Sequence, residues 1–365
     1  MQLIERCRKR AAEEEIPLRE IFDEVCRSSG PVAQSVSFSE IENSMYKRRR
    51  LALPTLPHVP EAGGSAIEHT RYATVGSSPF FRGQVSSGAD DTALLFSTDT
   101  QLQLLQNAHV IYVDSTFRVV PALYYQLFTI FVPHADYSFP ACFALMTRKT
   151  TALYRAMLER LHQLVPNFAP TQLIADFEDA PAAAFRTVFG DQLAISGCWF
   201  HYAQAVIRRM KKLGLQEAYK TQEQSQLAFR CILSLPLLPV SDIEPGFGDL
   251  KTRDIDDAAS KQLMQQLLRY VDRQWLKKAS IGPTRLSVRD NTSRTNNAME
   301  SFHAALRQRV KVAHPNLYTF LGHLQRMTTD QQTEIERVNR GLTIRRAKKK
   351  SYVINDARIR TCINR

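Results

Sequence analysis

Long apolar runs and cysteines are scarce in this sequence, and each scarcity excludes a class of protein. No run approaches the roughly 20 apolar residues that a membrane-spanning helix needs, so we expect no membrane partner. The chain starts Met-Gln-Leu-Ile-Glu-Arg-Cys-Arg-Lys-Arg, which lacks the apolar core of a secretory signal. Its six cysteines have no framework spacing, which excludes a disulfide scaffold and predicts reduced thiols in an intracellular compartment.

Basic residues, in contrast, clearly outnumber acidic ones. The formal net charge is +12 and the isoelectric point is near 9.5. With 44% hydrophobic and 23% charged residues, the 365-residue chain has the composition of a globular protein with one large or two ordinary domains. The charge excess favours a polyanionic partner, with nucleic acid as the first candidate, although a solvated basic surface without a partner would have the same composition.

Composition and hydrophobic periodicity divide the chain into six segments. Amphipathic helices are predicted at the start, and Pro, Gly, Ser and His then indicate a linker. A segment with strand patterns follows, and after it comes a segment with helical patterns alone. The chain then continues with a capped helix and a basic C-terminal end. The predicted segments are an N-terminal helical region (1–60), a linker (61–90), an α/β core (91–214), a helical segment (215–290), the last part of the core (291–335) and a basic tail (336–365).

Apolar, β-branched runs joined by short links predict a mixed α/β sheet in the core. The runs include the stretch 107–117, and three of them follow one another in hairpin order before crossover helices begin. The other predicted strands are Tyr124–Val132, Phe139–Met146, Gln172–Ala175 and Leu193–Trp199, with a short additional strand at Ala93–Ser97. The predicted helices are Thr98–Ala108, Thr151–Leu164, Ala180–Val188, Phe200–Leu213 and Thr292–Val310.

Two of these strands end on aspartate, and a later helix carries a glutamate. Asp114 and Asp176 lie at strand ends that a mixed sheet can bring to one edge, and the helix 292–310 can add Glu300. Several carboxylate oxygens that converge on one point are what a pair of divalent ions requires. Each residue also has an ordinary alternative, because Asp114 suits a turn, Asp176 can cap the following helix, and a mid-helix Glu300 is commonly solvent-exposed.

The motifs around these carboxylates resemble the transposase domain of Mutator-like elements, which belongs to the RNase H-like group with an Asp-Asp-Glu triad. The resemblance covers about residues 90–330 and rests on Val113-Asp114-Ser115-Thr116-Phe117, Ile174-Ala175-Asp176-Phe177-Glu178, Cys198-Trp199-Phe200-His201 and the stretch from Thr295 to His303. It implies an RNase H-like mixed five-stranded sheet flanked by helices, with an all-helical insertion at 215–290 before the catalytic helix. It also implies that Asp114, Asp176 and Glu300 are catalytic and hold Mg²⁺, or Mn²⁺ in its place.

Further residues near the triad have expected roles. Cys198 and His201 make half of a structural zinc site, with no second pair at finger spacing, so we expect no structural zinc. The resemblance places them beside the active centre, where His201 would contact DNA phosphate or orient the cleaved strand. Glu178 is expected to lie next to Asp176 and support it without being a metal ligand itself. Among many basic residues we prefer Arg294, Arg307 and Lys311 for phosphate contacts, because they lie on or next to the Glu300 helix.

The predicted function is therefore that of a DNA transposase that cuts and joins strands, acting on transposon ends and target DNA. Because two ends are handled together, we expect a homodimer or higher oligomer, and in a eukaryotic host a nuclear location. Basic clusters at 47–50 and 345–350 suit nuclear import signals or DNA-contacting tails. Two alternatives stay open: a domesticated, catalytically silent DNA-binding protein, and a related nuclease that cleaves without joining. Many relatives carry a small zinc-binding module for DNA recognition in front of this domain. This sequence has no Cys/His cluster of that kind near its start, so no segment can be assigned to the recognition of element ends.

Overall fold

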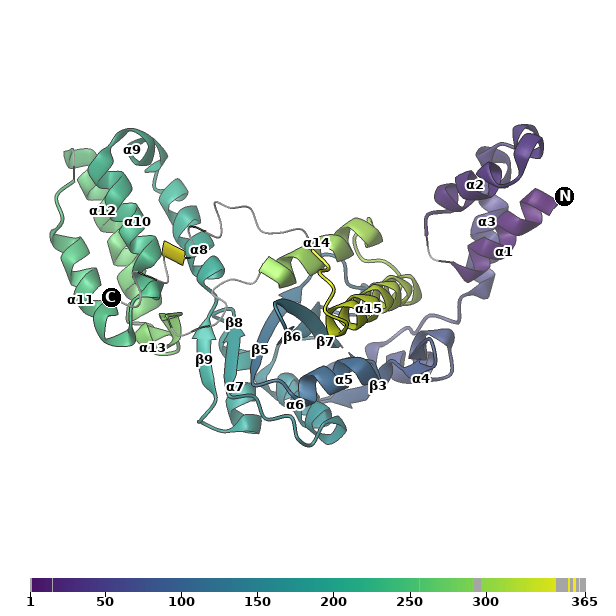
Figure 1. Ribbon diagram of the computed structural model, residues 1–365, viewed down its shortest axis with the longest axis horizontal. Coiled ribbons are helices and arrows are strands. Elements are labelled where there is room, and N and C mark those ends of the chain that lie inside the picture. Colours follow the sequence, from purple (N-terminus) through teal and green to yellow (C-terminus); the bar gives the residue numbers. More distant parts are fainter. Residues whose placement is uncertain are drawn as a thin grey trace.

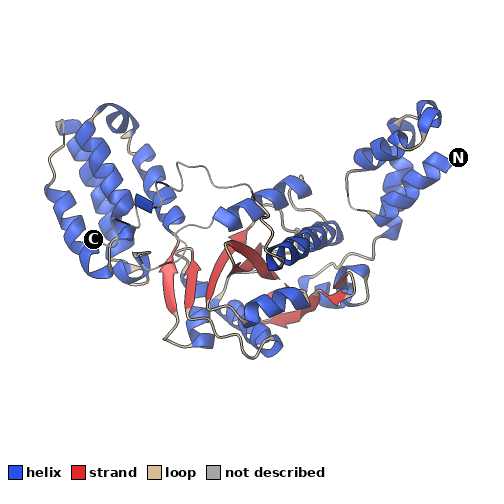
Figure 2. Cartoon of the chain, in the orientation of Figure 1, coloured by secondary structure: helices blue, strands red, loops and turns tan. Residues whose placement is uncertain are grey.

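The computed structural model describes residues 2–14, 16–255, 257–289, 291 and 297–345, together with positions 354, 357, 358 and 361. A β-sheet with covering helices occupies the middle of the molecule, and helical bodies lie on both sides of it (Figures 1 and 2). Within the described residues, no helix is both long and apolar enough to cross a membrane. The basic cluster at 345–350 lies outside the described residues except for Arg345.

The N-terminal region forms three α-helices and a short 3-10 helix that pack around a small core of their own. The elements are α1 (Gln2–Glu13), α2 (Leu18–Arg27), the 3-10 helix η1 (Gly30–Ser35) and α3 (Phe38–Ala52). Apolar side chains at helical spacing, such as Ile21 and Val25 on α2, face the interior of this unit. Arg49, from the basic cluster at 47–50, donates hydrogen bonds to the carbonyls of Ala11 (3.0 Å) and Glu14 (2.8 Å) at the end of α1.

Residues 61–90, which were predicted as a linker, form several short elements instead. They are η2 (Pro60–Ala62), α4 (Gly63–Glu68), η3 (Arg71–Ala73), the small hairpin of β1 (Thr74–Val75) and β2 (Ser78–Pro79), and β3 (Phe81–Ser86). The Pro and Gly residues mark the turns between these elements. Gly63 also allows a close approach, because a Cβ at this position would lie 2.2 Å from the Tyr124 hydroxyl.

The central sheet has seven strands in the order β3-β4-β7-β6-β5-β8-β9. Its remaining strands are β4 (Thr92–Phe96), β5 (Val110–Thr116), β6 (Gln126–His134), β7 (Tyr137–Met146), β8 (Gln172–Ala175) and β9 (Ala194–Gly197). Strands β5, β8 and β9 are parallel, and the other pairs are antiparallel. The mixed α/β class is thus confirmed, but the predicted number of five strands in the sheet is wrong. The short strand predicted at 93–97 joins the sheet as β4, and β3 adds an edge strand that was not predicted.

Helices cover both faces of the sheet. One core lies between the sheet and α5 (Asp99–Gln106), α6 (Thr151–Leu164) and α7 (Asp179–Phe189). The opposite core lies beneath α14 (Asn297–Val310) and α15 (Leu317–Asn339). Side chains along β5 point alternately to the two faces and so contribute to both cores. Ile111 and Val113 belong to the first core and Tyr112 to the second. Nearly continuous apolar strands follow from this burial on two faces.

The described residues of 215–290 form helices and turns that pack with α8 (Trp199–Lys212) into a separate lobe (Figure 1). Its elements are α9 (Gln216–Thr221), α10 (Glu223–Ser234), η4 (Leu235–Leu237), α11 (Val240–Thr252), α12 (Ala258–Val271), the π-helical turn η5 (Asp272–Leu276) and α13 (Gly282–Leu286). Pro236 and Pro239 lie where α10 gives way to α11, as the missing amide hydrogens require. The lobe interrupts the chain between the last strand and α14.

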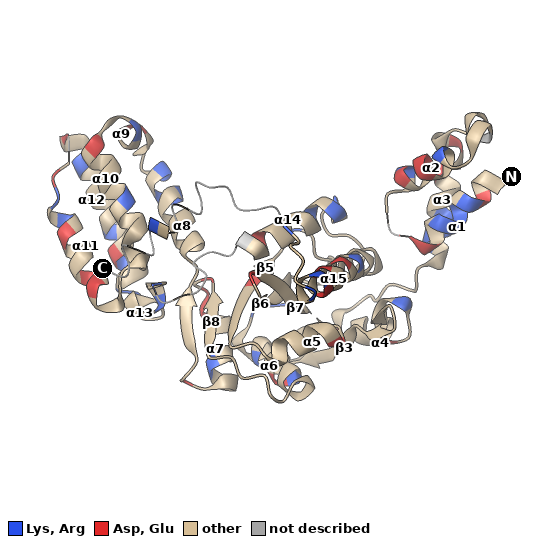
Figure 3. Cartoon of the chain, viewed as in Figure 1, with Lys and Arg blue, Asp and Glu red and all other residues tan. Residues whose placement is uncertain are grey.

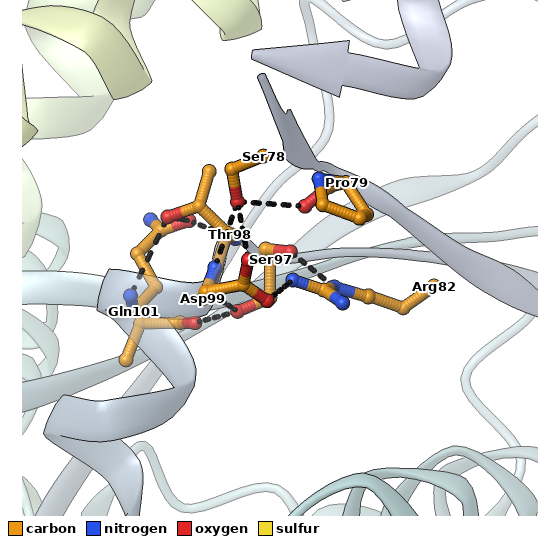
Figure 4. Close-up of polar contacts among 8 residues, drawn as sticks. Ser78, Pro79, Arg82, Ser97, Thr98, Asp99 and Gln101 are labelled. Atoms are coloured by element: carbon orange, nitrogen blue, oxygen red, sulfur yellow. Dashed lines mark hydrogen bonds and ion pairs between the residues drawn. The ribbon is translucent and has the colours of Figure 1, made fainter. Parts of the chain in front are cut away.

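A polar network holds the corner between β4 and α5 (Figure 4). Thr98 Oγ1 accepts a hydrogen bond from the backbone nitrogen of Gln101 (3.4 Å), and Gln101 Oε1 accepts one from the backbone nitrogen of Thr98 (2.9 Å). This is a capping box, which satisfies amide groups at the start of the helix. Arg82 of β3 and Ser78 of β2 both donate to the Asp99 carboxylate, at 2.6 and 3.0 Å. The edge strands are thereby tied to α5.

Replacing Thr98 with alanine should lower the free energy of unfolding by about 1 kcal/mol, the usual cost of a lost N-cap. Thr98 is fully buried, so water does not replace its hydroxyl group. Thr98→Ser keeps the capping oxygen and is expected to stay within a few tenths of a kcal/mol of the wild type. Urea unfolding of the three proteins measures the difference. Equal losses in the alanine and serine variants would contradict a capping role.

Candidate active site

The two predicted aspartates occupy equivalent positions on neighbouring parallel strands. Strand β5 pairs with β8 so that Val110 lies beside Gln172 and Tyr112 beside Ile174. Asp114 and Asp176 each come two residues after that last pair, at the carboxyl edge of the sheet. Adjacent strands lie about 4.8 Å apart, so this register brings the two carboxyl groups close together. The sheet itself therefore creates the pair.

Burial and neighbouring charge disfavour the ionised form of Asp176. Burial raises the pKa of this carboxyl group, and the negative charges of Glu178 and Asp114 raise it further. Two groups oppose the rise: the backbone N–H of Glu178, which donates to Asp176 Oδ1 at 3.0 Å, and His201. The site thus holds an aspartate whose charge is incompletely compensated by the protein.

Glu300 reaches the same edge from α14, the helix that covers the sheet face toward which Asp114 points. Helix α14 packs on the sheet through Met299, Phe302 and Leu306, and the Phe302 ring stacks on Phe143 with centroids 5.6 Å apart. This anchoring orients the half-buried Glu300 toward the aspartates. Burial raises the pKa of Glu300, and the Asp114 charge adds to the rise, while His201, His303 and Arg307 lower it. Asp176 and Glu300 therefore each lie within electrostatic reach of Asp114.

His303 lies one helical turn after Glu300 and contacts the first aspartate. Its Nδ1 atom is 3.2 Å from Asp114 Oδ2, and its side chain is only 5% exposed. The ring lies beside those of Phe131 and Phe302, at centroid distances of 6.4 and 5.8 Å. His303 Nε2 is buried and has no hydrogen-bond partner among the described residues. The sequence signal for this contact is the i, i+3 spacing, which places Glu300 and His303 on one helix face.

His201 adds a cationic group to the cluster. Burial opposes its protonation, but the Cys198 sulfur and the carboxylates of Asp114 and Asp176 raise the pKa of His201 to about 9. Cys198 is buried at the N-cap of α8, and His201 follows in the first turn, so the Cys-x-x-His spacing places both beside the aspartates. The structure thus brings together the predicted residues Asp114, Asp176, Glu300, Cys198 and His201.

Glu178 lies next to the carboxylate cluster and is paired with a lysine. Its side chain forms an ion pair with Lys149 at 2.8 Å, while its backbone supports Asp176. Arg285 of α13 is buried. Its guanidinium donates to the carbonyls of Asp176 (2.8 Å) and Glu178 (2.7 Å) and lies 3.4 Å from the Asp179 carboxylate. Arg285, which belongs to the helical lobe, therefore holds the loop that carries Asp176. The local sequence around Arg285 does not predict this role.

The aromatic ring after Asp176 joins the sheet to the helical lobe. Phe177 packs against Trp275 with ring centroids 4.7 Å apart, and the Arg285 guanidinium lies over its other side. Gly197 at the end of β9 permits this packing, because a Cβ there would lie 2.1 Å from the Phe177 ring. The loop that carries Asp176 is therefore clamped between β9 and the lobe.

The predicted phosphate-binding residues are distributed over different surfaces. Arg307 is exposed on α14, and its charge lowers the pKa of Glu300, so it lies near the carboxylates. Lys311 lines a separate cavity with Arg309 and His323, next to the N-terminal helices. Arg294 lies outside the described residues. Figure 3 shows basic positions along α8 and α14 on either side of the sheet edge.

Two aromatic residues of the Cys-x-x-His segment have structural roles. The Trp199 indole donates to the carbonyl of Leu233 (2.8 Å), and the Tyr202 hydroxyl donates to that of Ile232 (2.8 Å). Both rings belong to the core of the helical lobe or pack against it. Trp199 and Tyr202 are therefore packing residues of the lobe.

The donor set at the sheet edge fits a hard divalent cation. Carboxylate oxygens are the ligands that Mg²⁺ and Mn²⁺ prefer. Burial raises the pKa values of Asp176 and Glu300, the Asp114 charge adds to both, and a bound cation would offset that negative charge. Among the residues that the structure describes, no three His, Cys, Asp or Glu side chains form a ready-made metal cage. Asp114, Asp176 and Glu300 are the residues that could hold such an ion.

The core of this site corresponds to a known protein family. Residues 110–205 match the family model of the MULE transposase domain, which confirms the resemblance over the segment from β5 into α8. This segment contains Asp114, Asp176, Cys198 and His201 and ends before Glu300. No curated protein matches the chain. Among solved structures, the chain is similar to a Drosophila P element transposase strand transfer complex, with 11% identity, 66% of this chain and 82% of that chain covered, and a TM-score of 0.38.

Replacing Gly197 with alanine should destabilise the protein by about 1–3 kcal/mol, the usual cost of overpacking a core. The new methyl group would collide with the Phe177 ring and displace the Asp176 loop. Gly248→Ala, in α11, is the matched control, since a Cβ there meets nothing within 4 Å and alanine favours a helix. Urea unfolding compares the two variants. A Gly197→Ala protein as stable as the control would contradict the proposed clamp.

Proposed function

We propose that this chain is a DNA transposase that cuts and joins strands through Asp114, Asp176 and Glu300. The observation that carries the proposal is the placement of three partly buried carboxylates at one sheet edge, two from adjacent parallel strands and one from the helix that covers the face next to them. The family match over residues 110–205 supports it, because it spans both aspartates. The substrate class would be double-stranded DNA, both as transposon ends and as target.

Each of the three carboxylates has its own structural support. His303 orients Asp114, the Glu178 amide and Arg285 orient the loop of Asp176, and the packing of Phe302 directs Glu300. Divalent ions bound by these oxygens would activate the attacking oxygen and neutralise the leaving one. Fixed ligands of this kind favour catalysis because little reorganisation is needed as charge develops.

The cationic residues around the carboxylates would position the phosphodiester. The raised pKa of His201 favours its protonated form, which can donate a hydrogen bond to a non-bridging phosphate oxygen. Arg307, exposed on the Glu300 helix, would contact a neighbouring phosphate. Water would attack first, at the element end, and release a 3′ hydroxyl group. That hydroxyl would then attack a phosphodiester of the target, so that one bond forms as another breaks.

The proposal extends to assembly and location. Because two element ends must be joined to one target, the active form would be a homodimer or higher oligomer. In a eukaryotic host the protein would act in the nucleus, where its substrate is enclosed. A net charge of +12 suits such a role, since DNA binding by basic proteins releases condensed counterions.

The decisive test is cleavage and joining of a labelled duplex that carries the sequences flanking the coding region, with Mg²⁺ or Mn²⁺ present. Asp114→Asn, Asp176→Asn and Glu300→Gln should each reduce activity more than a hundredfold, beyond the 10–100-fold effect typical of outer-shell residues around a metal. Glu159→Gln is the control, because this carboxylate is half-exposed on α6 and its ion pair among the described residues is with Arg155. Chelation of the metal should abolish both reactions.

Three outcomes would change the assignment. Cleavage without joined products would indicate a nuclease. Salt-dependent DNA binding without any cleavage would favour the catalytically silent alternative. Activity that survives Glu300→Gln would show that another carboxylate completes the site.

A further inference from the structure

Two aromatic side chains are exposed beside the carboxylate edge of the sheet. Phe117 is 39% exposed and Tyr125 is 48% exposed, whereas most large aromatic residues of this fold are buried. Their rings meet edge to face, with centroids 5.3 Å apart. Phe117 follows β5 three residues after Asp114, and Tyr125 immediately precedes the antiparallel strand β6, so both lie at the edge that carries the triad.

Tyr125 forms one wall of a cavity of about 600 Å³. Val59, Pro60 and Leu123 provide further apolar surface, Glu61 and Asp90 provide carboxylates, and residues 147–150 complete the lining. The volume lies within the roughly 300–1,000 Å³ range of small-molecule sites in proteins. Hereafter "aromatic pocket" denotes this cavity together with Phe117, which packs against Tyr125.

The rim of the aromatic pocket is held by hydrogen bonds across the sheet edge. The Thr147 hydroxyl donates to the Asp90 carbonyl (3.0 Å), and the Thr150 hydroxyl donates to the Asp91 carboxylate (3.0 Å). Arg148 also pairs with Asp91, at 3.0 Å. These contacts join the segment after β7 to the segment before β4, so the opening has a defined shape.

Lys149 connects the aromatic pocket to the candidate active site. Its ammonium group pairs with Glu178 at 2.8 Å, and Glu178 supports Asp176 through its backbone amide. The hydrogen bond to Glu178 raises the pKa of Lys149, with smaller contributions from Tyr125 and Asp176. A strand that entered the active centre would therefore pass directly beside this opening.

We propose that the aromatic pocket receives an unpaired base of the DNA strand next to the cleaved phosphodiester. Exposed aromatic rings bind single-stranded nucleic acid because every base offers a face for stacking. Lys149 lines the cavity and the exposed Arg118 directly follows Phe117 in the chain, so these two cations can neutralise the flanking phosphates. Glu61 and Asp90 can accept hydrogen bonds from exocyclic amines, so adenine, cytosine and guanine are preferred over thymine. This inference rests on the proposed function for its substrate, but its test measures binding alone.

The test uses the full chain in EDTA and a duplex with a short single-stranded overhang that contains 2-aminopurine, whose fluorescence falls on stacking. Tyr125→Ala should weaken binding of the overhang duplex about 5- to 150-fold, the loss expected for one base–aromatic stack. Tyr125→Phe keeps a ring and should bind like the wild type. Tyr46→Ala is the control, because Tyr46 is a 60% exposed aromatic residue on the N-terminal helices.

A second arm replaces the stacked nucleotide with an abasic one. If the base occupies the aromatic pocket, the abasic substrate and Tyr125→Ala should cause equal losses, and their combination should cause no further loss. The proposal would be overturned if the two losses of binding affinity were additive, or if Tyr125→Ala quenched 2-aminopurine fluorescence as strongly as the wild type. Either result would leave the proposed DNA cleavage by the triad untouched. If the wild type binds blunt duplex but gains nothing from an overhang, the pocket proposal is likewise wrong. If it binds no DNA of any form, the proposed function fails as well.

Discussion

Electrostatic repulsion among Asp114, Asp176 and Glu300 is the constraint on which the rest of this structure depends. Burial raises the pKa values of Asp176 and Glu300, the Asp114 charge raises both further, and the three carboxylates would separate if they were free to move. The parallel pairing of β5 with β8 prevents that for the two aspartates. The aromatic packing of Phe302 on Phe143 does the same for the helix that carries Glu300. Charge concentration of this kind is characteristic of functional sites rather than of structural ion pairs.

The helical lobe is part of this support. Arg285 extends from α13 to the carbonyls of Asp176 and Glu178, and Phe177 extends from the sheet into the lobe against Trp275. Helix α8 begins the lobe and simultaneously places His201 among the carboxylates. A shift of the lobe would therefore move an aspartate and a histidine together. The helical lobe between β9 and α14 thus helps to fix the positions of Asp176 and His201.

Sequence patterns were sufficient wherever local chemistry determines structure. The helix 151–164 and the strand 172–175 have the predicted bounds, because apolar periodicity and β-branched runs report burial directly. Asp114 and Asp176 could be selected because they end such runs. Residues 61–90 were misassigned because β3 is short, rich in polar residues and only partly buried, so that no periodic signal arises. The roles of His303 and Arg285 also escaped prediction, since they depend on contacts with residues more than one hundred positions away.

The space between the carboxylates of Asp114, Asp176 and Glu300 should bind a divalent cation, and diffraction tests this directly, without DNA. A crystal of the full chain soaked in Mn²⁺ should show an anomalous difference peak bounded by the carboxylates of Asp114, Asp176 and Glu300. The same soak of a Glu300→Gln crystal should show a weaker peak or none. Manganese bound elsewhere at millimolar concentration, with the triad position empty in the wild type, would contradict the account.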